Sequence, residues 1–320
     1  MNLAYLALSS MIISLVAIFF SFIVGWLNRK LIAHFQHRVG PFLAGPHGIL
    51  QEFADFIKLM SKEVVEPAGS DSFLMDISPV LAVAALLYAM LFIPFTSTKG
   101  LLGFSGDLIF LIALETIITL LILLTGYASV GPFATVGTGR LGEQVISYEI
   151  PFASSMIAAM IVAGTATISE IVRFQSNVWI IVLNPIAFIV FIIGLLGEFH
   201  VQPFAPPVVE TEIAAGYEVE VSARRLAFFK LAHNIELLWF SLLGAILFLG
   251  GPQPLIPGYE WLGIIWISLK ALLIIFIVSL LESVFATYRI DQVVRIFWKW
   301  YIPLGIVSIL LSVFVRFYVF

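Results

Sequence analysis

The sequence predicts an all-α polytopic membrane protein that crosses the bilayer about eight times. Hydrophobic residues make up 61% of the chain, charged residues only 11%, and the mean hydropathy is +1.08. A soluble domain cannot remove that much apolar surface from water, and the apolar runs have the ~20-residue length that a spanning helix needs. We interpret residues 1–320 as one membrane domain.

Each apolar run is bounded by polar, Gly or Pro residues, which sets the expected spans. These are Leu3–Leu27, Ile77–Phe95, Leu108–Val130, Ile150–Ile168, Val178–Gly197, Leu226–Gly250, Trp261–Leu281 and Trp300–Val319. The polar connections expected on the cytoplasmic side cover residues 28–72, 131–149, 198–225 and 282–299. The other connections are short, so most of the polar chain lies on one side.

The distribution of Lys and Arg predicts the orientation. One set of connections holds Arg29, Lys30, Arg38, Lys58, Lys62, Arg140, Arg224, Arg225, Arg289, Arg295 and Lys299. The opposite set holds Lys99, Arg173 and Arg316. We therefore expect the cytoplasmic side to carry the first set, with both termini outside the cell membrane.

The first cytoplasmic connection contains an amphipathic pattern. Apolar residues from Ile49 to Met60 recur at helical spacing, with Gln51, Asp55 and Lys58 between them. This pattern is typical of a helix lying along the membrane surface. It can serve as a simple anchor or as a platform at the mouth of a cavity.

Several kinds of chemistry have no sequence support. The chain has no cysteine, so no thiolate can hold an iron–sulfur cluster. The histidines lack metal-binding spacing, and neither a phosphate loop nor a basic run suited to nucleic acid occurs. We expect no cofactor in this chain and place any redox chemistry in another subunit.

Acidic residues gather in two polar connections. The segment 198–225 carries Glu198, Glu210, Glu212, Glu218 and Glu220. The glycine-rich segment 131–149 carries Glu143 and Glu149, and Glu149 could also act as a helix cap. A solvated acidic loop is the simple interpretation of the first segment, and a partner surface or proton-handling site is the functional one.

Ionisable residues also fall inside the expected spans. Glu115, Glu236 and Lys270 lie there, and Lys230 and His233 share a broad helix face with Glu236. Because burying such groups is costly, each is a functional candidate. A structural ion pair, such as Glu236 with Lys270, is the alternative, but as a set these residues favour a proton relay.

Three long motifs resemble the membrane subunit of respiratory complex I known as the H subunit. They are QHRVGPFLAGPHGILQEFADFIKLMSKE (36–63), TGYASVGPFATVGTGRLGEQVISYEIP (125–151) and YRIDQVVRIFWKWYIPL (288–304). The resemblance extends over nearly the whole chain. It implies eight spans and a subunit that joins a soluble redox arm to the membrane arm.

The resemblance implies proton-path roles for Glu143, Glu149, Glu198, Glu210 and Glu212, which match acids of that family's motifs, and it places Arg289 and Asp291 in its last-loop motif. The other residues named next are expected from their positions and charges in this sequence. Expected proton-relay and coupling residues are Glu115, Glu143, Glu149, Glu198, Glu210, Glu212, Glu218, Glu220, His233, Glu236, Lys270 and Asp291. The expected docking surface comprises Arg29, Arg38, Asp55, Lys58, Lys62, Glu63, Arg140, Arg224, Arg225 and Arg289. Expected partners are the subunits of the soluble arm, antiporter-like membrane subunits and the lipid bilayer.

The acidic segment departs from the quinone-reducing pattern of acidic-Thr-Asn-Arg-x-Pro-Phe-Asp. Here residues 198–205 read EFHVQPFA, Val208 replaces a usual Glu, and Asn28-Arg29 replaces a usual Glu-Arg. These departures favour the related membrane-bound hydrogenases and sulfane reductases of archaea, and we take the hydrogenase as the leading hypothesis. The resemblance then implies hydrogenase-like large and small subunits and iron–sulfur subunits in the soluble arm. A NiFe centre and iron–sulfur clusters would lie in those partners.

Other interpretations stay open. A membrane-bound sulfane reductase or a quinone-reducing complex I would use the same kind of subunit. A stand-alone ion transporter is the alternative of a different class, and a pure anchor whose acids only form ion pairs is the simplest. The chemistry that separates the redox alternatives lies in neighbouring subunits.

Overall fold

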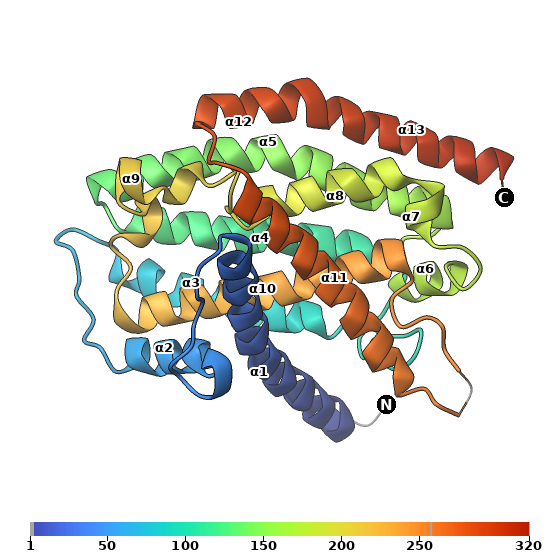
Figure 1. Ribbon diagram of the computed structural model, residues 1–320, viewed down its shortest axis with the longest axis horizontal. Coiled ribbons are helices and arrows are strands. Elements are labelled where there is room, and N and C mark those ends of the chain that lie inside the picture. Colours follow the sequence, from blue (N-terminus) through green and yellow to red (C-terminus); the bar gives the residue numbers. More distant parts are fainter. Residues whose placement is uncertain (1–2, 257, 320) are drawn as a thin grey trace.

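A computed structural model describes residues 3–256 and 258–319, and within these ranges the chain is helical, without strands. The helices pack as one bundle in which most long helices run side by side, while the dark-blue N-terminal helix lies obliquely to them (Figure 1). Among the described residues, seven helices are long and apolar enough to cross a membrane. They are α1 (Leu3–Phe35), α3 (Ser72–Met90), α4 (Asp107–Ala128), α5 (Pro132–Ala163), α10 (Ala223–Leu249), α11 (Leu262–Val284) and the rod from α12 (Ile290–Ile296) to α13 (Ile302–Tyr318).

The expected span Val178–Gly197 is a shorter, broken helix. It consists of α7 (Ile180–Leu183) and α8 (Pro185–Glu198). The side chain of Asn184 accepts a hydrogen bond from the Ala187 N–H and so caps α8. Its amide also donates to Ser312 Oγ at 2.7 Å, which ties the break to α13. With α7 and α8 counted together, the apolar segments number about eight, as the sequence predicts.

Helix α10 lies at the centre of the bundle and is the most buried of the candidate spans. In its most apolar stretch, 89% of the residues are buried. It packs against α1, α3 and α11, while α5 packs against α8 and α13 (Figure 1). In contrast, α1 exposes Leu8, Leu15 and Phe19, as expected of a helix that faces lipid or a partner. Glu236 in the middle of α10 is therefore held in the interior, whereas Arg224 and Lys230 near its start are exposed.

The prediction of a loop over 131–149 is wrong, because α5 begins at Pro132 and continues through this segment. Gly137 in this helix serves close packing instead of bending. A Cβ atom at Gly137 would lie 2.7 Å from Gly216 Cα and from the Tyr217 nitrogen. The small residue lets α5 approach the backbone of the acidic segment, an advantage that compensates for the low helix propensity of glycine.

The connection expected over 282–299 is also shorter than predicted. Helix α11 continues to Val284, and α12 begins at Ile290. A π-helical turn at Phe297–Tyr301 joins α12 to α13. Phe297 is buried there, with its ring centroid 4.7 Å from that of Phe204 in the acidic segment. This aromatic contact stabilises helical structure where the charges of the sequence suggest a loop.

The amphipathic pattern forms α2 (Gln51–Met60), as predicted. Between α8 and α10, the acidic segment folds into 3₁₀ turns at Pro206–Val208 and Gly216–Glu218 and one helical turn, α9 (Glu210–Ile213). Both termini lie toward the end of the bundle that carries α6 (Ile168–Phe174) and α7, away from α9 (Figure 1). This arrangement agrees with an even number of crossings.

Candidate functional site

Three helices bring carboxyl groups together inside the bundle. Glu115 of α4, Glu198 at the end of α8 and Glu236 of α10 are each no more than 3% exposed. Glu198 contacts both of the other side chains at hydrogen-bond range. We call these three residues the acid cluster. Two carboxyl groups can hydrogen-bond each other only when one carries a proton, so this geometry is suited to proton sharing.

Neutral side chains complete the surroundings of Glu198. Thr119 Oγ1 lies 3.1 Å from Glu198 Oε1 and also donates to the backbone of Glu115. Tyr148 of α5 is buried beside Glu198. No basic side chain forms an ion pair with Glu115 or Glu198 among residues 3–256 and 258–319, so hydroxyl groups, not counter-charges, line this part of the interior.

Glu149 extends the acid cluster toward the outside of α5. It is half-buried, accepts a hydrogen bond from Thr116 Oγ1 and interacts electrostatically with Glu115. Glu143 lies two turns earlier in α5, and its side chain is exposed. The two acids of the glycine-rich motif thus occupy different positions, Glu149 beside the interior and Glu143 on the outer face.

A cavity of about 290 Å³ opens beside the acid cluster, between α1, α2, α3, α4, α10 and the acidic segment. Its polar lining residues are Asn28, Arg29, Glu52, Ser78, Thr125, His200, Glu218, Lys230, His233, Asn234 and Glu236. Glu236 belongs to both the acid cluster and this wall, and His233 Nδ1 lies 4.0 Å from Glu236 Oε2. The central cavity therefore connects the buried acids with a polar space.

Burial changes the protonation of the cavity residues in the acidic segment. Desolvation lowers the pKa of His200 to about 3, which keeps its imidazole neutral. Burial raises the pKa of Glu218, and the nearby charge of Lys230 offsets only part of this change. Burial, with the charge of Glu218 in addition, also raises the pKa of Tyr217. The wall formed by this segment thus favours uncharged side chains.

At the cavity rim an ion-pair network joins α1 to α2. Arg29 Nε lies 2.6 Å from Glu52 Oε1, and Arg29 Nη1 lies 3.1 Å from Asp55 Oδ2. Lys58 also pairs with Asp55. Partial burial raises the pKa of Asp55, but hydrogen bonds from Lys58 and Arg29 outweigh it and hold the pKa below its usual value. Two expected docking residues, Arg29 and Asp55, therefore help to fix α2 on α1, and Lys58 supports Asp55 within α2.

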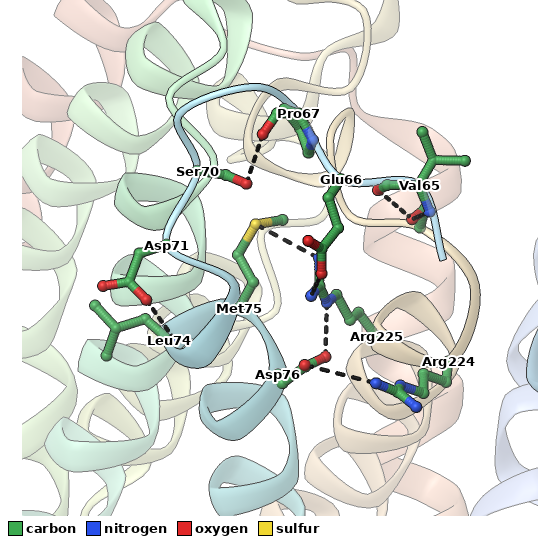
Figure 2. Close-up of polar contacts among 11 residues, drawn as sticks. Val65, Glu66, Pro67, Ser70, Asp71, Leu74, Met75, Asp76, Arg224 and Arg225 are labelled. Carbon is green, nitrogen blue, oxygen red and sulfur yellow. Dashed lines mark hydrogen bonds and ion pairs between the residues drawn. The ribbon is translucent and has the colours of Figure 1, made fainter. Parts of the chain in front are cut away.

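Arg225 does not belong to an exposed docking surface, contrary to the prediction. Its side chain is 1% exposed and lies between Glu66 and Asp76, at 2.7 Å from each carboxylate (Figure 2). Arg224 stays exposed and lies 3.6 Å from Asp76 Oδ2. A buried guanidinium held by two carboxylates is a structural clamp, because its donors are occupied within the chain.

The remaining predicted residues lie at the surface. Arg140 Nη1 donates to Glu212 Oε2 at 2.6 Å and links α5 to α9. Other predicted residues that are exposed are Arg38, Lys62, Glu63, Glu210, Arg289 and Asp291, and Glu220 is half-buried beside Gly131. These side chains do not join the acid cluster, and they lie where a partner can reach them.

Lys270 lies apart from the acid cluster. Its ammonium donates to the carbonyls of Gly251 and Gln253, at 2.8 and 2.6 Å, and lies 5.0 Å from the Trp179 ring centroid. The alternative of an ion pair with Glu236 is therefore wrong. Lys270 instead closes the turn that follows α10.

Sequence reasoning missed Thr119, Tyr148 and Glu52 as members of the site. Thr119 lies one turn after Glu115, and Tyr148 directly precedes Glu149, so spacing could have indicated both. Glu52 reads as a polar position of an amphipathic helix, but it is only 6% exposed because Arg29 pairs with it.

Comparison with known proteins gives the family of this chain. The family described as NADH dehydrogenase matches residues 8–313. The H subunit of NADH-quinone oxidoreductase from Thermomicrobium roseum is 36% identical over 91% of this chain and 90% of its own length. The protein of the same name from Pelagibacter ubique is 31% identical over 99% of this chain and 97% of its own.

The similarity extends over the acid cluster, the central cavity and all the spanning helices. A similar match, 34% identity over 94% of this chain, occurs with the corresponding protein of Anoxybacillus flavithermus. The chain is thus a multi-pass membrane protein, and it belongs to the family of the complex I H subunit, a membrane component of NADH-quinone oxidoreductase.

Proposed function

We propose that this chain joins a soluble redox arm to the membrane arm of a complex I-like assembly and passes protons through its buried acids. The observation that carries the proposal is the meeting of Glu115, Glu198 and Glu236 beside a polar cavity. Such groups are costly in a membrane interior unless they have a function. The protein is a subunit of a respiratory oxidoreductase, and this chain supplies no redox centre to it.

The proton path begins at the central cavity. His233 lies on its wall beside Glu236, and Glu236 contacts Glu198. Glu198 in turn contacts Glu115, which interacts with Glu149. A redox event that moves the acidic segment changes the charge near Glu218 and His200. The proton affinity of the acid cluster responds through electrostatic coupling, and protons move on toward antiporter-like subunits.

The soluble arm docks at the end of the bundle that carries α2, α9 and the start of α12. Exposed charged residues at this end include Arg38, Lys62, Glu63, Glu210 and Arg289. We place this end in the cytoplasm and both termini outside the cell membrane, because Lys and Arg concentrate in its connections. Exposed charges there provide complementary contacts for subunits of the arm.

For the redox partner we favour a ferredoxin-dependent, hydrogen-evolving arm with a NiFe centre and iron–sulfur clusters in its own subunits. Support comes from the cavity wall, where His200, Val201 and Val208 stand at positions that differ from the quinone-reducing pattern. Quinone reduction is the second candidate, favoured by the cavity itself and by the names of the relatives. A sulfane reductase arm would dock in the same way.

Isolation of the native membrane complex tests the choice of partner. Nickel, iron and ferredoxin-dependent hydrogen evolution support the first candidate. Turnover with a lipophilic quinone would instead identify a quinone-reducing arm. Polysulfide reduction without nickel would identify a sulfane reductase arm. Ion transport by the purified chain alone, reconstituted in vesicles, would contradict the subunit role altogether.

The relay is tested separately with Glu198→Gln. The amide keeps the size and hydrogen-bonding ability of the side chain but cannot exchange a proton at neutral pH. We expect assembly to be retained and the number of protons pumped per electron to fall. The matched control is Glu260→Gln, since Glu260 is exposed in the turn after α10. Equal pumping in both variants would refute the relay.

A further inference from the structure

Glu282 is a half-buried carboxylate outside the acid cluster. It lies in the last turn of α11, and its Oε2 atom is buried without a hydrogen-bond partner. No ion pair joins it to a basic side chain within the described ranges 3–256 and 258–319. A buried carboxylate without a counter-charge costs stability, so its presence requires an explanation.

The partner of Glu282 is Asn28 of α1. The Asn28 side chain lies beside Glu282, and its Oδ1 accepts from Ser279 Oγ at 2.6 Å. Ser279 and Glu282 lie three residues apart on the face of α11 that meets α1, so both side chains reach the same amide. One side chain of α1 thus links two polar groups of α11.

Asn28 also lines the central cavity, whose opposite wall includes Glu236. Glu282 therefore lies directly behind the cavity wall, one side chain away from the polar space. The neighbouring cations are engaged elsewhere. Arg29 pairs with Glu52 and Asp55, and Lys30 Nζ donates to the Pro41 carbonyl at 3.0 Å.

We propose that Glu282 is a second proton-exchanging carboxylate of this subunit, connected to the central cavity through Asn28 and separate from the acid cluster. In the exchange, a carboxylate oxygen takes one proton from a hydronium ion in the cavity, which becomes water, and later gives that proton back to a water molecule. The inference rests on the proposed relay function, because it adds a branch to the same cavity.

Asn28 makes this exchange compatible with a fixed contact between α1 and α11. An ionised carboxylate can only accept a hydrogen bond, and the amide NH₂ of Asn28 can donate it. A protonated carboxyl group gains a donor, which can turn to a water or carbonyl oxygen. The carboxyl group can therefore change its charge while Ser279 continues to hold Asn28 against α11.

The proposal predicts a specific chemical reactivity. Dicyclohexylcarbodiimide attacks protonated carboxyl groups in apolar surroundings. In the purified complex we expect mass spectrometry to find the adduct on Glu282, with less labelling as the pH rises. Exposed Glu260 serves as the internal control and should remain unlabelled. Absence of an adduct on Glu282 at every pH would overturn the proposal.

Three variants complete the test. We expect Glu282→Gln to lower the number of protons pumped per electron and to shift the pH profile of turnover, and Glu282→Asp to restore both. If the Glu282→Gln variant does not assemble, the proposal is tested by carbodiimide labelling of Glu282 and by the pumping of the Glu282→Asp variant. Unchanged pumping in Glu282→Gln, with pumping lost in Glu198→Gln, refutes this inference alone. Unchanged pumping in both variants refutes the relay as well.

Discussion

Arg225 Nε donates to Asp76 Oδ1 at 2.7 Å, which joins the first turn of α10 to the first turns of α3. The same guanidinium donates to Glu66 Oε1 from the connection that leads into α3 (Figure 2). Ser222 Oγ accepts a hydrogen bond from the Val65 N–H and donates one to the Val65 carbonyl. The segment that follows α2 is therefore anchored to the helix that carries Glu236.

Replacement of Arg225 by leucine should destabilise the protein. Breaking a fully buried ion pair costs ~3–5 kcal/mol, and we expect about 2 kcal/mol here because Asp76 and Glu66 are partly exposed. Thermal unfolding of the purified complex measures the loss. Arg224→Leu is the matched control, since Arg224 is exposed and only 3.6 Å from Asp76. Equal losses in the two variants would contradict the clamp.

Replacing Gly137 or Gly139 of α5 by alanine should have different effects on stability. Gly137→Ala places a Cβ 2.7 Å from the backbone of Gly216 and Tyr217, and relieving this overlap should cost ~1–3 kcal/mol. Gly139 has no atom within 4 Å of the added Cβ, so Gly139→Ala should be neutral or stabilise the helix by up to about 1 kcal/mol. Thermal unfolding distinguishes them, and a stabilising Gly137→Ala would show that the contact is loose.

The fold is largely predictable because apolar runs of membrane length indicate spanning helices directly. Composition and periodicity also indicate α2. The errors occur where tertiary contacts outweigh local signals. Glycines suggest a loop over 131–149, but Gly137 is required for close packing within a helix. Similarly, charges suggest a loop near 290, but Phe297 anchors a helix there through Phe204.

The candidate site is predictable only in part. Glu115 and Glu236 stand out because charges within apolar runs are rare, and the structure brings them together through Glu198. Spacing along the chain cannot reveal which distant side chains meet. For this reason the sequence groups Lys270 with acids that it does not contact, and it gives no signal for Glu282 at the end of a span.

Lys270→Met should lower stability without affecting the relay. The ammonium donates to the carbonyls of Gly251 and Gln253, and a hydrogen bond to a charged group contributes ~1.5–3 kcal/mol. We expect a loss of about 2 kcal/mol in unfolding experiments. Proton pumping per electron should be unchanged in the assembled variant. A loss of pumping with normal stability would instead return Lys270 to the proton path.

Glu143→Gln should alter a contact between subunits and leave the fold intact. Glu143 is exposed on α5 near Ile146, which is 63% exposed. An exposed acid contributes little to stability, so the unfolding temperature should stay within about 1 °C. Pumping by the complete complex should fall if a neighbouring membrane subunit receives protons at this face. Normal pumping would limit the relay to Glu149 and the acid cluster.

His200 predicts how stability changes with pH. Burial lowers its pKa to about 3 in the folded protein, against 6.5 for an exposed histidine, so the unfolded chain binds the proton more tightly. Stability must therefore fall as the pH drops from 6.5 toward 3, by about 1.4 kcal/mol for one pH unit from this residue.

His200→Asn should remove this part of the pH dependence. Asparagine tolerates the left-handed backbone of His200, whose φ is 51°, and it does not titrate. Thermal unfolding measured from pH 7 to about pH 5.5 should then give a smaller decrease for the variant than for the wild type. His34→Asn is the control, because His34 is exposed. Parallel curves for wild type and His200→Asn would show that the imidazole reaches solvent protons in the folded state, and the cavity wall would then be charged at neutral to acidic pH.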